Sequence, residues 1–66
     1  MYNFLYFKRV QMGLTQRALA EQSGVSRRTI CSLESTGRIP SPRVGVRLCR
    51  VLGCGWEEVF PLDVLL

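Results

Sequence analysis

The sequence predicts an all-α domain of five short helices, and three observations lead to this fold class. Apolar residues recur at helical spacing in several short stretches of the chain. Glycine or proline separates these stretches, and both residues commonly mark where a helix ends. A chain of 66 residues buries only about 60% of its unfolded surface and forms one small domain. We therefore expect a single domain over residues 1–66.

The first expected helix runs from about Tyr2 to Met12. We expect Leu5 and Met12 in the core, with Arg9 on the same face. Arg9 then needs a partner, because burying an unpaired charge is costly. The opposite face is also apolar, which a simple amphipathic helix does not explain. Either the last helix and the tail cover this face within one monomer, or it is a dimer contact; it carries Phe4, Phe7 and Val10.

Two short helices with a tight turn between them are predicted next. Thr15 is a good N-cap for a helix from Thr15 to Gln22, and Gly24 favours the left-handed conformation that ends it. Ser26 then caps a second helix that reaches about Ser35. A helix, a short turn containing glycine and a second helix form a helix-turn-helix unit, here over about residues 15–35.

The second of these helices has two different faces. Ile30 and Leu33 point toward the expected core, with Thr29 and Glu34 beside them. The other face has no acidic side chain and consists of Arg27, Arg28, Cys31, Ser32 and Ser35. Guanidinium groups and hydroxyls suit phosphates and the guanine edge, since arginine can pair with both guanine acceptors in the major groove.

This segment resembles the Cro/C1-type helix-turn-helix of phage repressors, the XRE family. The resemblance covers roughly residues 5–62. It implies a lambda-repressor-like fold and DNA binding. The matching residues are Gly13-Leu14-Thr15-Gln16, Leu19-Ala20, Gly24-Val25-Ser26, Ile30, Leu33-Glu34, Gly37 and Pro40, with Arg9, Leu52-Gly53 and Phe60 outside the unit.

The resemblance also assigns roles to residues. Arg9 is expected to pair with Glu34, and Gln16 to bond a DNA phosphate while bracing the second helix of the unit. The loop after that helix is expected to follow the sugar-phosphate backbone, near the dyad of a dimer. We expect base contacts from Arg27, Arg28, Ser32 and Cys31. We expect phosphate contacts from Gln16, Arg17, Ser26, Thr29, Gly37, Arg38 and Arg43.

Two more helices are expected after the loop. Pro42 suits the first turn of a helix that ends near Leu52, and Gly55 to Phe60 forms a short last helix. The apolar residues of this last helix, Trp56, Val59 and Phe60, are expected to pack on the core. The remaining residues, 61–66, form a tail that is more apolar than a free tail should be. Apolar contacts from the fourth helix are expected from Val44, Leu48, Val51 and Leu52.

Charge and cysteine content narrow the function classes. Nine Lys and Arg residues against five Asp and Glu residues give a net charge of +4, which suits a polyanionic partner. Three cysteines without CxxC spacing, and the lack of any histidine, argue against a zinc site or a disulfide framework. We expect free thiols and no cofactor or metal; a redox role for Cys31 is the alternative.

No catalytic constellation is apparent, since the chain has no histidine base, Walker loop or GxGxxG motif. Neither a membrane span nor a signal peptide is expected. The leading hypothesis is a cytoplasmic, bacterial or phage-encoded transcriptional regulator that binds double-stranded DNA sequence-specifically. It would act as a repressor that binds a two-fold operator as a homodimer.

The alternative is an antitoxin or co-regulator that uses the fold mainly to bind a protein partner, held by the apolar tail. An acid-free face that carries Arg27 and Arg28 favours DNA, because a protein-binding module has no reason to keep it. RNA is a weaker interpretation, since no aromatic stacking surface is interleaved with the basic residues.

Overall fold

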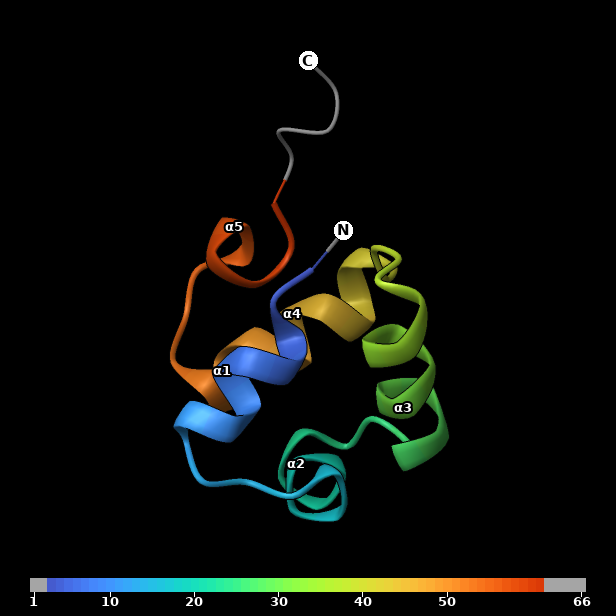
Figure 1. Ribbon diagram of the computed structural model, residues 1–66, viewed down its shortest axis with the longest axis vertical. Helices are drawn as coiled ribbons and strands as arrows, with labels where there is room; N and C mark the ends of the chain where they lie inside the picture. Colours follow the sequence, from blue (N-terminus) through green and yellow to red (C-terminus); the bar gives the residue numbers. More distant parts are fainter. Residues whose placement is uncertain (1–2, 62–66) are drawn as a thin grey trace.

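Five helices form the part of the chain that the structure describes, and that part contains no strand, as predicted (Figure 1). The structure is a computed structural model that describes residues 3–61. No helix in this range is long and apolar enough to cross a membrane. The helices are α1 (Leu5–Gln11), α2 (Gln16–Ser23), α3 (Arg27–Thr36), α4 (Pro42–Leu52) and α5 (Trp56–Val59).

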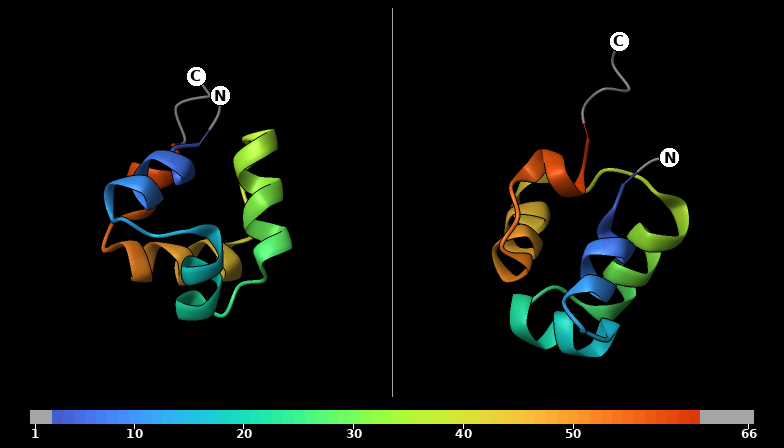
Figure 2. Two further views of the ribbon diagram at one scale, coloured as in Figure 1. Left: turned by 60° about the horizontal axis from the view of Figure 1, so that its bottom comes forward. Right: turned by 60° about the vertical axis from the view of Figure 1, so that its left-hand side comes forward.

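The helices surround one core, with α1 and α4 crossing the middle of the molecule and α2 below them (Figure 1). Helix α2 packs against both α3 and α4, while α1 contacts α3 and α4 contacts α5. Helix α3 stands at the right-hand edge in Figure 1 and in the left view of Figure 2, and one of its faces is exposed (Figures 1 and 2). The two ends of the described chain meet where the Phe4 amide donates to the Val59 carbonyl oxygen at 2.7 Å.

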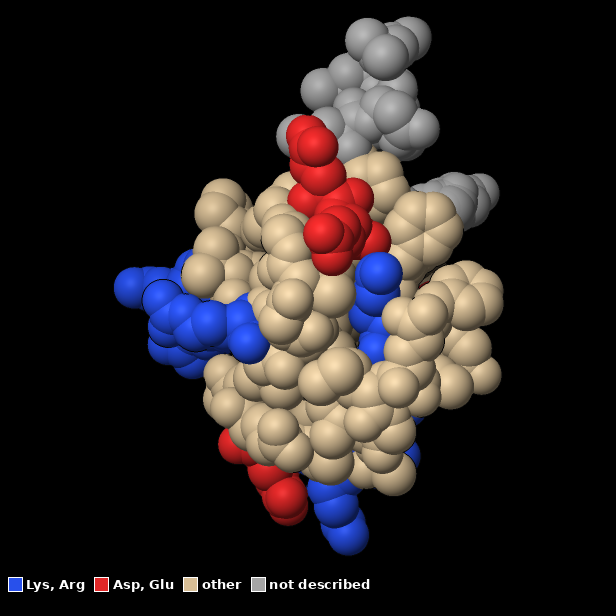
Figure 3. Space-filling model, turned by 90° about the vertical axis from the view of Figure 1, so that its left-hand side faces the viewer, with Lys and Arg blue, Asp and Glu red and all other residues tan. Residues whose placement is uncertain are grey.

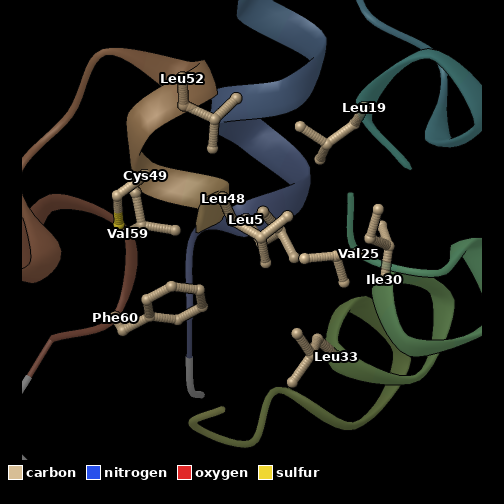
Figure 4. Packing of buried hydrophobic residues seen from close by; sticks show 10 residues of the cluster. All are labelled: Leu5, Leu19, Val25, Ile30, Leu33, Leu48, Cys49, Leu52, Val59 and Phe60. Carbon is tan, nitrogen blue, oxygen red and sulfur yellow. The ribbon is translucent and has the colours of Figure 1, made fainter. Parts of the chain in front are cut away.

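The core takes at least one apolar side chain from every helix and lies between them (Figure 4). Its centre includes Leu5, Ile30 and Leu33, which confirms the predicted burial of Leu5 and the predicted inward face of the third helix. Trp56 is half-buried and packs against the same cluster. The buried apolar residues are Leu5, Leu19, Val25, Ile30, Leu33, Leu48, Cys49, Leu52, Val59 and Phe60.

Local signals in the sequence correctly predict where α2 and α3 begin and end. The Thr15 hydroxyl accepts from the Ala18 amide at 3.0 Å, and the Ser26 hydroxyl accepts from the Thr29 amide at 3.1 Å. Each satisfies a backbone N–H that lacks a partner inside the helix. Gly24 ends α2 with φ of +78°, a conformation in which a Cβ atom would be strained.

Two expectations for the first helix are wrong. The helix begins at Leu5, because the Phe4 amide bonds to Val59 across the molecule and the Asn3 side chain accepts from the Leu5 amide. Tyr2, the expected start, lies outside the described residues. Met12 is 51% exposed instead of buried, because it caps the helix and leads into a solvent-facing turn at Gly13.

The apolar outer face of α1 is not covered by the last helix. Phe4, Phe7 and Val10 are all exposed, which contradicts that part of the expectation. Helix α5 has only four residues, between the N-cap Gly55 and the C-cap Phe60. It lies beside the apolar face of α1 without covering it. Apart from Pro61, the tail of residues 61–66 that was also expected to cover it lies outside the described part of the chain.

Candidate nucleic-acid interface

The exposed face of α3 and the start of α2 form one continuous surface. Arg27, Arg28, Cys31 and Ser35 are exposed on this surface, and Ser32 is half-buried. Together with Gln16 they line a hollow of about 600 Å³. A second hollow of about 410 Å³ adjoins it at Gln16 and Arg27, and is lined further by Arg9, Thr15 and Arg17. Neither hollow has an acidic residue in its lining.

The backbone adds positive potential to this surface. Gln16 and Arg27 are the first residues of α2 and α3, and neither helix has an acidic residue in its first turn. Unpaired N–H groups and the helix dipole favour anions at such ends. The structure therefore places two positively polarised helix ends beside the arginine side chains of the hollows.

Glu34 connects three helices beneath this surface. The Arg9 guanidinium forms two bonds to its carboxylate: Nε lies 2.7 Å from Oε2 and Nη2 lies 3.1 Å from Oε1. The Arg9 and Glu34 side chains are only 11% and 8% exposed, and Arg9 Nη1 also donates to the Leu14 carbonyl oxygen at 2.8 Å. The hydrogen bond to Glu34 raises the pKa of Arg9, against the opposing effect of burial. The pair fixes α1 to α3.

Gln16 joins the same cluster from α2, since its Nε2 donates to Glu34 Oε1 at 3.0 Å. An amide nitrogen carries two hydrogens, so the second one remains available to another acceptor. This geometry matches the bracing part of the role that the resemblance assigned to Gln16. Its contact with a phosphate remains a proposal.

Ser26 and Thr29 form a small hydroxyl pair at the start of α3. Besides accepting from the Thr29 amide, the Ser26 hydroxyl donates to Thr29 Oγ1 at 2.9 Å. The Thr29 hydroxyl hydrogen is thereby left to donate outward. The sequence placed both residues among the phosphate contacts, and the structure sets them at the end of α3 that carries Arg27.

A clamp that sequence reasoning missed holds the loop between α3 and α4. The Asn3 side chain donates to the carbonyl oxygens of Leu33 and Arg38, at 3.0 and 2.9 Å. It thus ties the last turn of α3 to the start of the loop. An Asn just before a helix is a known capping signal, but its long-range partners have no local signature.

The expected phosphate contacts in this loop are arranged in different ways. Arg38 folds back, and its Nη2 lies 3.4 Å from Ser32 Oγ on the exposed face of α3. Arg43 is exposed in the first turn of α4. The Gly37 N–H already donates to the Leu33 carbonyl oxygen at 3.0 Å, so it is not free for a phosphate. Gly37 instead supplies the positive φ of +72° that ends α3.

No group of three or more metal-binding side chains lies close together within residues 3–61. All three thiols are free: Cys31 is exposed, Cys49 is buried and Cys54 is half-buried. Burial raises the pKa of the Cys49 and Cys54 thiols and disfavours their thiolates. Only Cys31 faces the surface described above.

Comparison with known proteins agrees with this geometry. The chain is 45% identical over 56 residues to an uncharacterized HTH-type transcriptional regulator of Methanothermobacter thermautotrophicus, covering 83% of this chain and 81% of the relative. It is 38% identical over 55 residues to one of Archaeoglobus fulgidus, covering 83% and 79%. YgzD, an uncharacterized HTH-type transcriptional regulator of Bacillus subtilis, is 31% identical over 55 residues, covering 83% of each chain. The helix-turn-helix family model matches residues 5–59. The chain therefore belongs to the Cro/C1-type (XRE) helix-turn-helix family of DNA-binding transcriptional regulators.

Proposed function

We propose that this chain is a sequence-specific transcriptional repressor that binds a two-fold operator in double-stranded DNA as a homodimer. The observation that carries the proposal is the acid-free surface around Gln16, Arg27 and Arg28. Such a surface suits the phosphate backbone and the acceptor-rich guanine edge together. The phage repressors that the sequence resembles support the repressor role, and the site of action proposed is the cytoplasm.

Base recognition is assigned to the first turns of α3 and the residues that follow. Arg28 and Ser32 are one helical turn apart, so both project along one line of the groove. A bidentate arginine–guanine pair discriminates against the wrong base by about 1–3 kcal/mol. The further base contacts in this proposal are Arg27 and Cys31. A redox role for Cys31 has no support in its surroundings beyond exposure.

Phosphate contacts are assigned to the residues that flank this row. Gln16 and Arg17 lie at the start of α2, and Ser26 and Thr29 at the start of α3, where helix ends favour anions. Arg43 projects from the start of α4. Arg38, which lies against Ser32, completes the set from the loop side. These contacts set register and add salt dependence without specifying sequence.

The test is a selection of bound duplexes from a random pool with the purified chain. We expect an enriched inverted repeat whose half-sites are about 34–36 Å apart, because each subunit presents one recognition helix. A reporter promoter that overlaps the selected site should lose expression when the chain is produced. A pool without an enriched motif would overturn the sequence-specific assignment, and increased reporter expression would overturn the repressor role.

A second candidate function is an antitoxin or co-regulator that mainly binds a protein. The exposed aromatic residues of α1 favour a protein–protein contact, since exposed apolar patches commonly mark interaction sites. If Arg28→Ala and Arg43→Ala both leave DNA affinity unchanged, this second function replaces the first.

A further inference from the structure

Helix α1 and its cap carry a row of exposed aromatic rings. Tyr6 and Phe7 meet edge-on with ring centres 5.5 Å apart, and Phe7 lies 6.4 Å from Phe4. Phe4, Tyr6 and Phe7 are 46%, 50% and 61% exposed. These three residues, called the aromatic row below, lie outside the hollows proposed to receive DNA. The Arg9 guanidinium lies over the Tyr6 ring, 5.3 Å from its centre, whereas the exposed faces of Phe4 and Phe7 form an apolar patch of the kind that marks interaction sites.

The aromatic row has a hollow on each side. The first, of about 400 Å³, lies toward α5 and is lined by Phe4, Phe7, Lys8, Gln11, Glu57 and Glu58. The second, of about 340 Å³, lies toward the end of α3, where Phe4 and Phe7 face Ser35, Thr36 and Gly37. Figure 3 views the molecule from the side away from α3 and shows acidic and basic atoms next to each other among uncharged ones.

We propose that a second copy of this chain docks on the aromatic row, with the two-fold axis passing beside Phe7. The charges around the row complement themselves: Lys8 of one copy would face Glu57 and Glu58 of the other, and the reverse. Within residues 3–61 the only ion pair joins Arg9 to Glu34, so these three charges have no ion-pair partner in the described chain. A two-fold axis makes both contacts at once.

The apolar area of the aromatic row is smaller than that of a standard dimer interface, which indicates a weakly associating dimer. An aromatic side chain buries about 150–250 Å² when covered, so three half-exposed rings supply roughly 300 Å² of apolar centre. A standard interface buries about 800 Å² per partner. The charged rim therefore has to contribute the remainder, and the pair should be weak in free solution. Two adjacent half-sites on DNA would complete it by raising the local concentration of the second copy.

The position of the row leaves most of the surface proposed for DNA free. The row adjoins the C-terminal end of α3, where Ser35 lines both the hollow beside the row and the hollow that contains Gln16, while Arg27 and Arg28 lie at the other end of that helix. Pairing through α1 therefore approaches the hollow that contains Gln16 only at its Ser35 edge. This inference rests on the proposed function for its two-fold operator, but it also predicts self-association without DNA.

The first test is sedimentation of the full chain over a range of concentrations, alone and with duplexes that carry one or two half-sites. Phe7→Glu should raise the dissociation constant of the dimer by about tenfold or more, because it places a carboxylate at the centre of the contact. Val46→Glu is the matched control, because Val46 is a 46% exposed apolar residue of α4 that lines neither hollow beside the row. It should dimerise like the parent.

The second test exchanges the rim charges between copies. Lys8→Glu alone, and Glu57→Lys with Glu58→Lys in one chain, should each weaken self-association, since like charges then meet across the axis. An equal mixture of these two proteins should recover the parent association, because both contacts of the mixed pair are again between opposite charges. Recovery in the mixture identifies contacts between chains, which a fold defect would not reproduce.

These outcomes separate the inference from the function on which it rests. A parent chain that stays monomeric both free and on a duplex with two half-sites overturns the inference. Unchanged association of Phe7→Glu, or a mixture without recovery, overturns it as well. If the parent binds no duplex, the proposed function fails, but the free-solution tests still decide the surface. A Phe7→Glu protein supports both the inference and the proposed function if it binds a duplex with one half-site as tightly as the parent does. It must then also lose the extra affinity that the parent shows for a duplex with two half-sites.

Discussion

Glu34 is the residue that fixes α3 to α1 and α2. It lies on α3 and accepts hydrogen bonds from Arg9 of α1 and Gln16 of α2. Because the Arg9 and Glu34 side chains are almost buried, the pair is screened little by solvent. A single carboxylate thus couples α2, which carries the proposed phosphate contact Gln16, to α3, which is proposed to contact bases.

We expect Glu34→Gln to destabilise the fold by about 3–5 kcal/mol, because Arg9 keeps its buried charge but loses the opposite one. Thermal or urea unfolding followed by circular dichroism measures this change. Glu21→Gln is the control, since Glu21 is exposed on α2, has no ion pair within the described residues and lies outside the proposed dimer contact. If Glu34→Gln unfolds with the parent, the pair is worth no more than a surface contact.

The arginines at the surface should separate into two classes. Arg28→Ala is expected to flatten the preference at particular operator positions, because it removes the proposed base contact. Arg43→Ala is expected to weaken all duplexes alike and to lower the salt slope by about one unit, because it removes the proposed phosphate contact. Affinities for single-base operator variants at two salt concentrations distinguish the classes. An Arg28→Ala protein with the parent preference profile would show that another residue contacts those bases.

At the scale of elements, close contact between helices depends on small residues. Gly45 lies inside α4 where a Cβ atom would overlap the Trp56 ring of α5. The tryptophan therefore lies directly against the α4 backbone and closes the core beside Phe60, whose ring centre is 5.1 Å from its own. The Asn3 clamp works at the same scale, since it holds the last turn of α3 to the loop.

Gly45→Ala is expected to destabilise the domain by about 1–3 kcal/mol, although alanine normally stabilises a helix interior relative to glycine. The clash with Trp56 reverses the usual sign. Gly55→Ala is the matched control: its φ of −76° suits alanine, and nothing lies within 4 Å of the added atom. Alanine is a poorer N-cap than glycine but reduces the entropy of the unfolded chain by about 0.4–1 kcal/mol, so these opposing effects leave a small net change. Unfolding curves of the two variants give the comparison, and equal stability would mean that Trp56 moves aside freely.

At the scale of the whole molecule, a small core makes stability sensitive to ligands. A domain of this size is only modestly stable alone. Repulsion among its positive charges, which give a net charge of +4, is reduced when a polyanion binds. Binding that favours only the folded state adds free energy in proportion to the logarithm of ligand concentration. DNA binding and folding are therefore coupled in this protein.

The selected operator should raise the melting temperature by roughly 10 °C or more when present at 100 times its dissociation constant, a gain of about 2.7 kcal/mol. A duplex of the same length with both half-sites scrambled serves as the control and should give a smaller shift. Equal shifts for both duplexes would indicate binding without sequence preference. The measurement is circular dichroism at 222 nm, a helix signal, with salt held constant.

The sequence by itself determined the features that depend on neighbouring residues. The number of helices, the caps at Thr15 and Ser26 and the inward faces of α3 follow from interactions within one or two turns. A capping hydroxyl or a helical apolar period acts over three or four residues, and the chain written as letters displays it directly. The pairing of Arg9 with Glu34 came from the family pattern and from the charge on an inward face.

Only the tertiary structure decided the features that join distant segments. The start of α1 depends on a bond from Phe4 to Val59, and the loop depends on Asn3 reaching Leu33 and Arg38. The exposure of the aromatic row was likewise undecided, because a helical period shows that a face is apolar but not whether another element covers it. These outcomes depend on where the five helices pack in space, and the lengths and caps of single helices do not fix that packing.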